Sequence, residues 1–254
     1  MQSQQGRAKL VAPLVVALLL PWPLLLAPDN WWAFVLITAA IAVTLRLVLG
    51  PGWTSIAGLK LSPAHALLVI ASFAIVATGS KVLLAAVYQS AGLISKPANI
   101  ENQIGFLFQA LNEEILFRAL LIGFIIQYVR SAPLVSIGLA LLFSATHFFL
   151  YRFSNPLHLP LSIAALATLF FAGVVMNSLY LIFRHVGFSW SLHAGWNVVW
   201  LPAPIYDAAS HELLHEPQVF DRVLGSPAIM AAACAMAVLS FAILVRRSSG
   251  QTSN

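Results

Sequence analysis

Long apolar stretches restrict this chain more than any other feature of its sequence. Eight of them are long enough to cross a bilayer as helices, because about 20 apolar residues span the hydrocarbon core. The connections between them are mostly short and rich in Pro, Gly and Asn, which favour turns. The predicted spans are 10–27, 31–49, 66–90, 104–129, 133–150, 160–183, 188–205 and 227–245. The sequence therefore predicts an all-α polytopic membrane bundle of about eight transmembrane helices.

The composition agrees with this class and excludes others. Only 8% of the residues are charged, against about 25% in soluble globular domains. A disulfide scaffold is excluded because Cys234 is the single cysteine. The net charge of +5 does not indicate nucleic-acid binding, since the basic residues are scattered singly among apolar stretches. No composition shift divides the chain, so residues 1–254 are expected to form one integral-membrane domain, with 10–27 as a retained span and not a signal peptide.

The distribution of charge predicts the orientation in the membrane. With the N-terminus inside, eight Lys and Arg residues fall in inner segments and three fall in outer segments. The carboxylates outside the spans all fall on the outer side, which includes an acidic loop over 206–226. The inner basic residues are Arg7, Lys9, Arg46, Lys60, Arg130, Arg184, Arg246 and Arg247. The positive-inside rule therefore predicts that both termini face the cytoplasm.

The span 104–129 contains charged residues that a bilayer disfavours. A carboxylate at the centre of a span costs about 2.5 kcal/mol or more, which makes it a functional candidate. Glu114 and Arg118 stand at i and i+4 with the acid first, so we expect an ion pair on one helix face. Glu113 is turned about 100° away and is expected to find its partner on another helix. A structural ion pair needs one glutamate, so the second glutamate favours a chemical role.

Two histidines and an amide in later spans supply possible partners. His147 lies near the end of the span 133–150, in the run Phe-Ser-Ala-Thr-His. His193 is followed one helical turn later by Asn197, and residues at i and i+4 share a helix face. Together with the glutamates, these side chains form a set of buried polar groups on three spans.

The patterns E-E-x-x-x-R, F-x-x-x-H and H-x-x-x-N, in this order on successive spans, resemble the CPBP family. This family comprises the CAAX-processing and bacteriocin-processing intramembrane proteases, also called Abi proteins, which are relatives of the Rce1-type prenyl-protein endopeptidase. The resemblance covers roughly residues 100–200, the expected catalytic core. It implies a glutamic intramembrane endopeptidase in which Glu113 is the base and activates water together with His147. In the same resemblance Glu114 and Arg118 support this pair.

The resemblance also implies the remaining site residues and the partners. His193 and Asn197 take the oxyanion-stabilising positions, which suits a hydrolysis that needs donors aimed at the tetrahedral oxyanion. No cofactor and no metal is implied. The expected partners are membrane lipid and a membrane-associated peptide or protein C-terminus, with no nucleic acid. The expected location is a plasma membrane, most simply that of a prokaryote.

A second motif competes with this interpretation. The run His211-Glu212-Leu213-Leu214-His215 matches H-E-x-x-H, which on a helix gives two zinc ligands and a general base. However, Pro217 follows closely and the run lies in the acidic outer loop instead of a span. Glu216 or Asp221 as a third ligand fits no usual spacing. The favoured interpretation is a solvated loop that holds at most a short helix.

Two further alternatives stay open from sequence. His147, His193 and Glu113 could bind zinc as a His2Glu set, which the sequence does not distinguish from metal-free activation of water. A proton-coupled transporter or a non-catalytic immunity or scaffold protein could also use buried Glu and His. The paired donors His193 and Asn197 and the lack of an inverted repeat argue against this class.

The predicted spans place the site residues at different depths. In straight, upright helices, Glu113 would lie about 24 Å from the inner side and His147 about 21 Å, but His193 only about 8 Å. The proposed site therefore requires tilted helices, a sunken inner end of the span 188–205, or span boundaries other than those predicted.

Overall fold

Each predicted span from 31 onward coincides over most of its length with helix in the described part of the chain. The computed structural model describes residues 31–251 except 57, 127, 155–159 and 202, so the predicted span 10–27 lies outside it. The α-helices are α3 (Trp31–Leu49), α4 (Trp53–Ile56), α5 (Pro63–Ala91), α6 (Ile100–Glu114), α7 (Gly123–Ile125), α8 (Ala132–Phe149), α9 (Ile163–Phe183), α10 (Val186–Trp200), α11 (Glu216–Leu224) and α12 (Pro227–Gln251). The other elements are the 3-10 turn η1 (Gly50–Gly52), the π-helical segments η2 (Ile115–Ile122) and η3 (Leu150–Ser154), and the strands β1 (Leu93–Ser95) and β2 (Ile205–Asp207).

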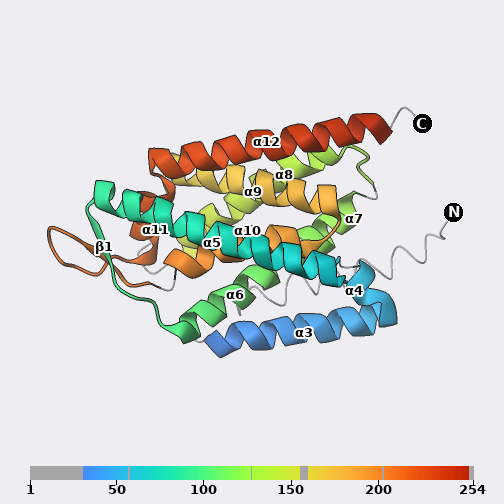
Figure 1. Cartoon of the computed structure of the whole chain (residues 1–254), viewed down its shortest axis with the longest axis horizontal. Helices are drawn as coiled ribbons and strands as arrows, with labels where there is room; N and C mark the ends of the chain where they lie inside the picture. Colours follow the sequence, from blue (N-terminus) through green and yellow to red (C-terminus); the bar gives the residue numbers. More distant parts are fainter. Residues whose placement is uncertain (1–30, 57, 127, 155–159, 202, 252–254) are drawn as a thin grey trace.

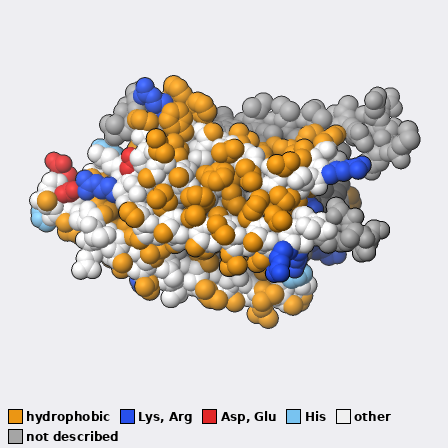
Figure 2. Space-filling view, turned by 90° about the horizontal axis from the view of Figure 1, so that it is seen from above, with side chains coloured by type: hydrophobic (Ala, Val, Ile, Leu, Met, Phe, Trp, Pro, Cys, Tyr) orange, Lys and Arg blue, Asp and Glu red, His pale blue; other side chains and the backbone are white. Residues whose placement is uncertain are grey.

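Four helices are long and apolar enough to cross a membrane. They are Pro63–Ala91, Ala132–Phe153, Ile163–Phe183 and Pro227–Ser249, and Trp31–Leu47 is a shorter apolar helix. The long helices run along the same direction in the bundle (Figure 1), and Figure 2 shows apolar side chains over the middle of one face with charged side chains toward its two ends. The chain is therefore a membrane protein with a helical bundle, while the count of eight spans remains a prediction.

Several predicted spans differ from the structure in their limits, and two of these spans carry site residues. The span 104–129 begins earlier, at Ile100, changes to π-helical geometry after Glu114, and ends its last α-helical segment at Ile125. The span 188–205 is predicted too long, since α10 ends at Trp200. Prolines cannot continue a helix, and the sequence places Pro202 and Pro204 directly after this residue.

The predicted acidic loop 206–226 contains regular structure. It starts in β2, which pairs antiparallel with β1 and is a small exception to the all-α class. It ends in α11, whose apolar face is buried against the bundle; the buried apolar side chains are Val219, Phe220, Val223 and Leu224. Nη1 of Arg222 donates to Asp207 Oδ2 at 2.6 Å, and this bond with two backbone N–H donors lowers the pKa of Asp207 to about 2.

Two glycines allow close helix packing around the polar motifs: Gly195 on α10 faces α5, and Gly105 on α6 faces α3. A Cβ at Gly195 on α10 would lie 3.1 Å from the carbonyl oxygen of Phe73 and 3.0 Å from a methyl carbon of Val76, both on α5. A Cβ at Gly105 on α6 would lie 3.0 Å from the Cα of Trp31 on α3. A larger residue at either place would push the helices apart, so these glycines fix the spacing around α6 and α10.

The start of α10 is set by His185. Its backbone is extended, its side chain is 7% exposed, and its Nδ1 accepts the backbone N–H of Gly187 at 2.8 Å as an N-cap. Because Nδ1 accepts a hydrogen bond, the ring is neutral. Burial and the nearby His65 lower the pKa of His185.

Acidification should destabilise the start of α10. The pKa of His185 is lower in the folded state than in the unfolded state. The neutral ring therefore contributes to stability above about pH 6.5, and this contribution is lost as the pH falls through the folded-state pKa. Protonation also removes the cap, which is worth about 1 kcal/mol. As the pH is lowered from roughly 7 to roughly 5, we expect the thermal unfolding midpoint in detergent to decrease. The fall should be smaller in His185→Asn, which caps without titrating, and an equal fall in both proteins would contradict the cap.

The predicted inner and outer connections lie at opposite ends of the bundle. In Figure 1, α4, which precedes α5, lies at the end opposite β1 and α11. Because the positive-inside rule assigns the first end to the cytoplasm, a reporter fused after Lys60 should report the cytoplasmic side. A reporter fused after Asp221 should report the outer side. Two reports from the same side would overturn the predicted orientation.

Candidate active site

The charged residues of the E-E-x-x-x-R motif stand where α6 passes into the π-helical segment η2. Glu113 and Glu114 are the last residues of α6, and Arg118 lies inside η2. Nη1 of Arg118 donates to Glu114 Oε1 at 3.0 Å, and both side chains are fully buried. The ion pair predicted from the i, i+4 spacing is confirmed. Short π-helical segments within helices occur frequently at functional sites.

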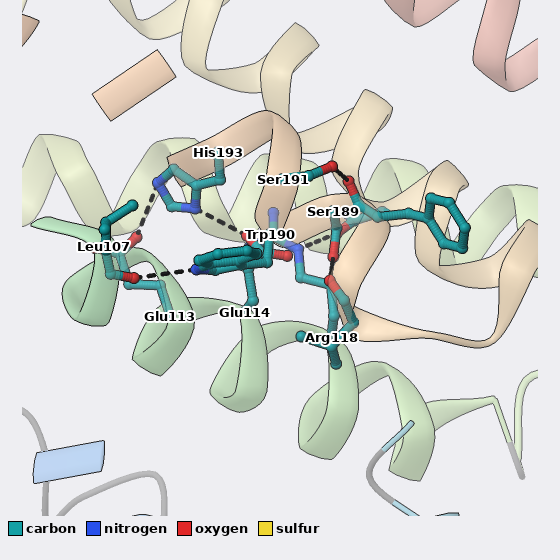
Figure 3. A network of polar contacts seen from close by, with 11 residues as sticks. Leu107, Glu113, Glu114, Arg118, Ser189, Trp190, Ser191 and His193 are labelled. Carbon is teal, nitrogen blue, oxygen red and sulfur yellow. Dashed lines mark hydrogen bonds and ion pairs between the residues drawn. The ribbon is translucent and has the colours of Figure 1, made fainter. Parts of the chain in front are cut away.

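His193 of α10 contacts both glutamates (Figure 3). Its Nδ1 lies 2.8 Å from Glu114 Oε1, and its Nε2 lies 3.8 Å from Glu113 Oε2. Glu114 is paired with Arg118 and is therefore a carboxylate, which only accepts hydrogen bonds, so Nδ1 of His193 donates. The distance from Nε2 to Glu113 is too long for a direct hydrogen bond. His193 is thus the partner that Glu113 was expected to find on another helix.

The contact also answers the discrepancy in depth. The last α-helical segment after Glu113 ends at Ile125 and α10 begins at Val186, whereas the predicted limits were 129 and 188. With these limits, Glu113 lies about 18 Å from its helix end and His193 about 10 Å from its own, so about half of the expected gap closes. Shifted boundaries therefore account for part of the discrepancy, and α6 is also inclined to α3 in Figure 1.

His147 of α8 lies beside the same cluster. Its Nδ1 is 2.9 Å from the carbonyl oxygen of Phe143, and because a carbonyl only accepts, Nδ1 carries the proton and Nε2 is free to accept. The ring centroid of Phe143 lies 4.5 Å from the ring centroid of His147 and 6.3 Å from that of His193. The charge of Glu113 acts on His147, although no hydrogen bond or ion pair between these two is present in the described part of the chain.

Asn197 lies on α10, one turn beyond His193. Its side chain is buried, and it forms no hydrogen bond with another of the described residues. The helical spacing places it on the same face as His193.

Sequence reasoning missed Asn177 on α9. Its Oδ1 accepts from Nε of Arg118 at 3.0 Å, and its Nδ2 donates to the carbonyl oxygen of Ser136 on α8 at 2.9 Å. No motif marks this residue. The one available signal was its position within a long apolar span, where an amide side chain requires a partner.

The competing H-E-x-x-H motif does not form a helix. His211 has a left-handed backbone with φ of 59°, and Leu213 forms a β-bridge with Tyr206. His215 is the N-cap of α11. Since a zincin site needs both histidines on one face of a helix, the structure contradicts this alternative. The preferred interpretation, an exposed loop with a short helix, is confirmed.

The alternative His2Glu zinc set is not assembled. Among the residues that the structure describes, no three His, Cys, Asp or Glu side chains are grouped so that they could hold a metal ion. His147, His193 and Glu113 are therefore not grouped as a three-residue metal site in this part of the chain. The site instead presents a carboxylate and two oriented imidazoles around the ring of Phe143.

Glu114→Gln should destabilise the protein far more than Glu113→Gln. It leaves the buried guanidinium of Arg118 without its counter-charge, which costs about 3–5 kcal/mol. Glu113→Gln leaves the Arg118 pair intact, removes only the charge in the longer 3.8 Å contact to Nε2 of His193, and introduces an amide that is cheaper to bury than a carboxylate, so it is the matched control. Thermal unfolding of both variants in one detergent measures the difference. Equal midpoints would contradict the assignment of the buried ion pair to Glu114.

The comparisons with known proteins agree with this geometry. The family model described as "Rce1-like: Type II CAAX prenyl endopeptidase Rce1-like" matches residues 103–199. No curated protein and no solved structure gives a significant match. The matched segment contains both glutamates, Arg118, both histidines and Asn197. This match over residues 103–199 supports the resemblance to the CPBP family, and this segment is similar to the Rce1-like type II CAAX prenyl endopeptidases.

Proposed function

We propose that this chain hydrolyses a peptide bond with water activated by Glu113. The main support for this proposal is that His193 contacts both glutamates, whereas Arg118 forms an ion pair with Glu114 alone. Glu113 therefore keeps a carboxylate that no cation of its own helix neutralises. Its side chain is 14% exposed, whereas that of Glu114 is fully buried, so water can reach Glu113.

The proposed role of His193 rests on the orientation of its ring. Nδ1 donates to Glu114 Oε1 at 2.8 Å, and Nε2 lies on the side of Glu113, 3.8 Å from its Oε2. In the proposed reaction Nε2 carries the proton that it donates to the oxyanion.

The residues then have complementary roles in the reaction. Water donates one hydrogen bond to Nε2 of His147 and loses its other proton to Glu113, and its oxygen bonds to the carbonyl carbon of the peptide. The electron pair of the carbonyl moves to its oxygen, which accepts hydrogen bonds from Nε2 of His193 and the amide of Asn197. When the intermediate collapses, the C–N bond breaks and Glu113 returns the proton to the leaving amine. Glu113 therefore ends the cycle as a carboxylate.

The setting of the site supports a membrane-associated substrate. The polar cluster lies among apolar helices, and the matching family is described as CAAX prenyl endopeptidases. We propose a peptide or protein C-terminus held at the membrane as the substrate, membrane lipid as the surrounding partner, and a prokaryotic plasma membrane as the location. The scattered basic residues support orientation in the membrane and not binding of nucleic acid.

Glu113→Gln should lower the rate of cleavage by about 10² or more, because general acid–base groups contribute about 10²–10⁴. The substrate probes are a quenched prenylated CAAX-type peptide and, in cells, the membrane and secreted proteomes with the wild-type or variant protein. Equal amounts of folded protein are compared. Glu212→Gln, in the exposed loop, is the control and should keep full activity.

Other outcomes of this assay identify the alternatives. An active Glu113→Gln protein together with an inactive Glu212→Gln protein would revive the loop metalloprotease. Cleavage that persists in both variants and in Glu114→Gln would contradict the glutamate mechanism and leave transport or scaffolding. Activity should survive treatment with a chelator such as phenanthroline. Loss of activity together with stoichiometric zinc would instead support the His2Glu set.

A further inference from the structure

We infer that Asn177 is a positioning residue of this site. It holds the guanidinium of Arg118 from α9 and, through Arg118 and Glu114, fixes the orientation and the tautomer of His193. The predicted effect of Asn177 on the rate of cleavage rests on the proposed function. Its predicted effect on the tautomer of the His193 ring does not depend on a substrate and can be measured separately.

Four hydrogen bonds connect three neighbouring helices to the imidazole. Asn177 donates to the carbonyl oxygen of Ser136 at 2.9 Å and accepts from Nε of Arg118 at 3.0 Å. Nη1 of Arg118 donates to Glu114 Oε1 at 3.0 Å, and Nδ1 of His193 donates to the same oxygen at 2.8 Å. Asn177, Arg118 and Glu114 are all at most 1% exposed, so no solvent competes for these bonds.

The ion pair alone does not fix the guanidinium. Arginine and carboxylate groups define each other's orientation best through two parallel hydrogen bonds. Here only Nη1 and Oε1 are joined, and among the described residues Nη2 of Arg118 and Oε2 of Glu114 are buried without a hydrogen-bond partner, although the hydroxyl of Ser189 lies near enough to act on the Glu114 carboxylate. A pair with one bond can rotate about it. The bond from Nε to Asn177 removes this freedom, since the guanidinium is planar and its donors move together.

The position of the guanidinium matters for His193. Its Nδ1–H has its acceptor on Glu114, and the hydrogen bond of one ring nitrogen decides which form the other nitrogen takes. If Arg118 turned away, Glu114 would follow its counter-charge and Nδ1 would lose its acceptor. The ring could then hold a proton on Nε2 alone or rotate. The first form is a weaker donor to the oxyanion than a ring protonated on both nitrogens, and rotation would turn Nε2 away from the oxyanion.

Asn177 could instead have only a structural role and hold α9 against α8. The neighbouring Ser178 provides a control for this role, because it is fully buried and its hydroxyl lies 3.3 Å from Oγ of Ser136 on α8. Ser178 is not bonded to Arg118 in the described structure. Ser178→Ala therefore removes a buried bond between the same two helices without touching the chain of bonds to His193.

The test combines nitrogen NMR with kinetics. Protein labelled with ¹⁵N-histidine in detergent micelles reports the protonation of each ring nitrogen, and the His193 signals are assigned by their loss in His193→Gln. Wild type and Ser178→Ala should show Nδ1 protonated. Asn177→Leu, which matches the size of the amide without its polar atoms, should show a mixture of forms. On the prenylated probe peptide, its kcat should fall by about 10–100-fold, the range for lost outer-shell partners, with KM nearly unchanged.

Each outcome decides the inference. An Asn177→Leu protein that keeps Nδ1 protonated and full kcat, and loses only thermal stability as Ser178→Ala does, would overturn it. If Asn177→Leu does not fold, Asn177→Ser gives the same test, because its side chain is too short to span Arg118 and Ser136. If wild type cleaves no substrate, the proposed function fails while the NMR result still stands. A shift of the His193 signals in the Asn177 variants alone would then support the positioning role.

Discussion

The positive charge of Arg118 lies inside an apolar bundle, where it must be balanced by nearby groups. Glu114 supplies the counter-charge one turn earlier, and Asn177 accepts a second bond, from Nε. Removing either partner of a buried pair is costly because the other charge is left unpaired. These bonds hold α6 with η2 and α9 in one arrangement, and His193 on α10 joins it through its bond to Glu114.

This arrangement separates the two adjacent glutamates. Glu114 is fully buried and accepts hydrogen bonds from both Arg118 and His193, so its charge is already used. Glu113 lies 3.8 Å from Nε2 of His193, too far for a hydrogen bond, and its side chain is 14% exposed. Two adjacent residues of one type thus have different surroundings.

Several features followed from local patterns in the sequence. Hydropathy predicted the helices within residues 31–251, and the i, i+4 rule predicted the Glu114–Arg118 pair. The limits of α10 and the strands β1 and β2 were not predicted, because short strands carry little signal next to long apolar helices. Asn177 was not predicted, because the partner of a single amide in an apolar span cannot be identified until the packing of the helices is known.

The sequence by itself determined the membrane class, the helices and the residues able to carry chemistry. These properties depend on hydropathy and on spacings of a few residues, which the chain displays locally. Only the tertiary structure decided that His193 meets Glu114 across 79 positions of sequence, that Asn177 anchors Arg118 across 59, and that His211 and His215 share no helix. Such contacts depend on how helices pack and where each begins and ends. A shift of two residues at a helix end moves a side chain by about 3 Å, which decides whether two groups form a hydrogen bond.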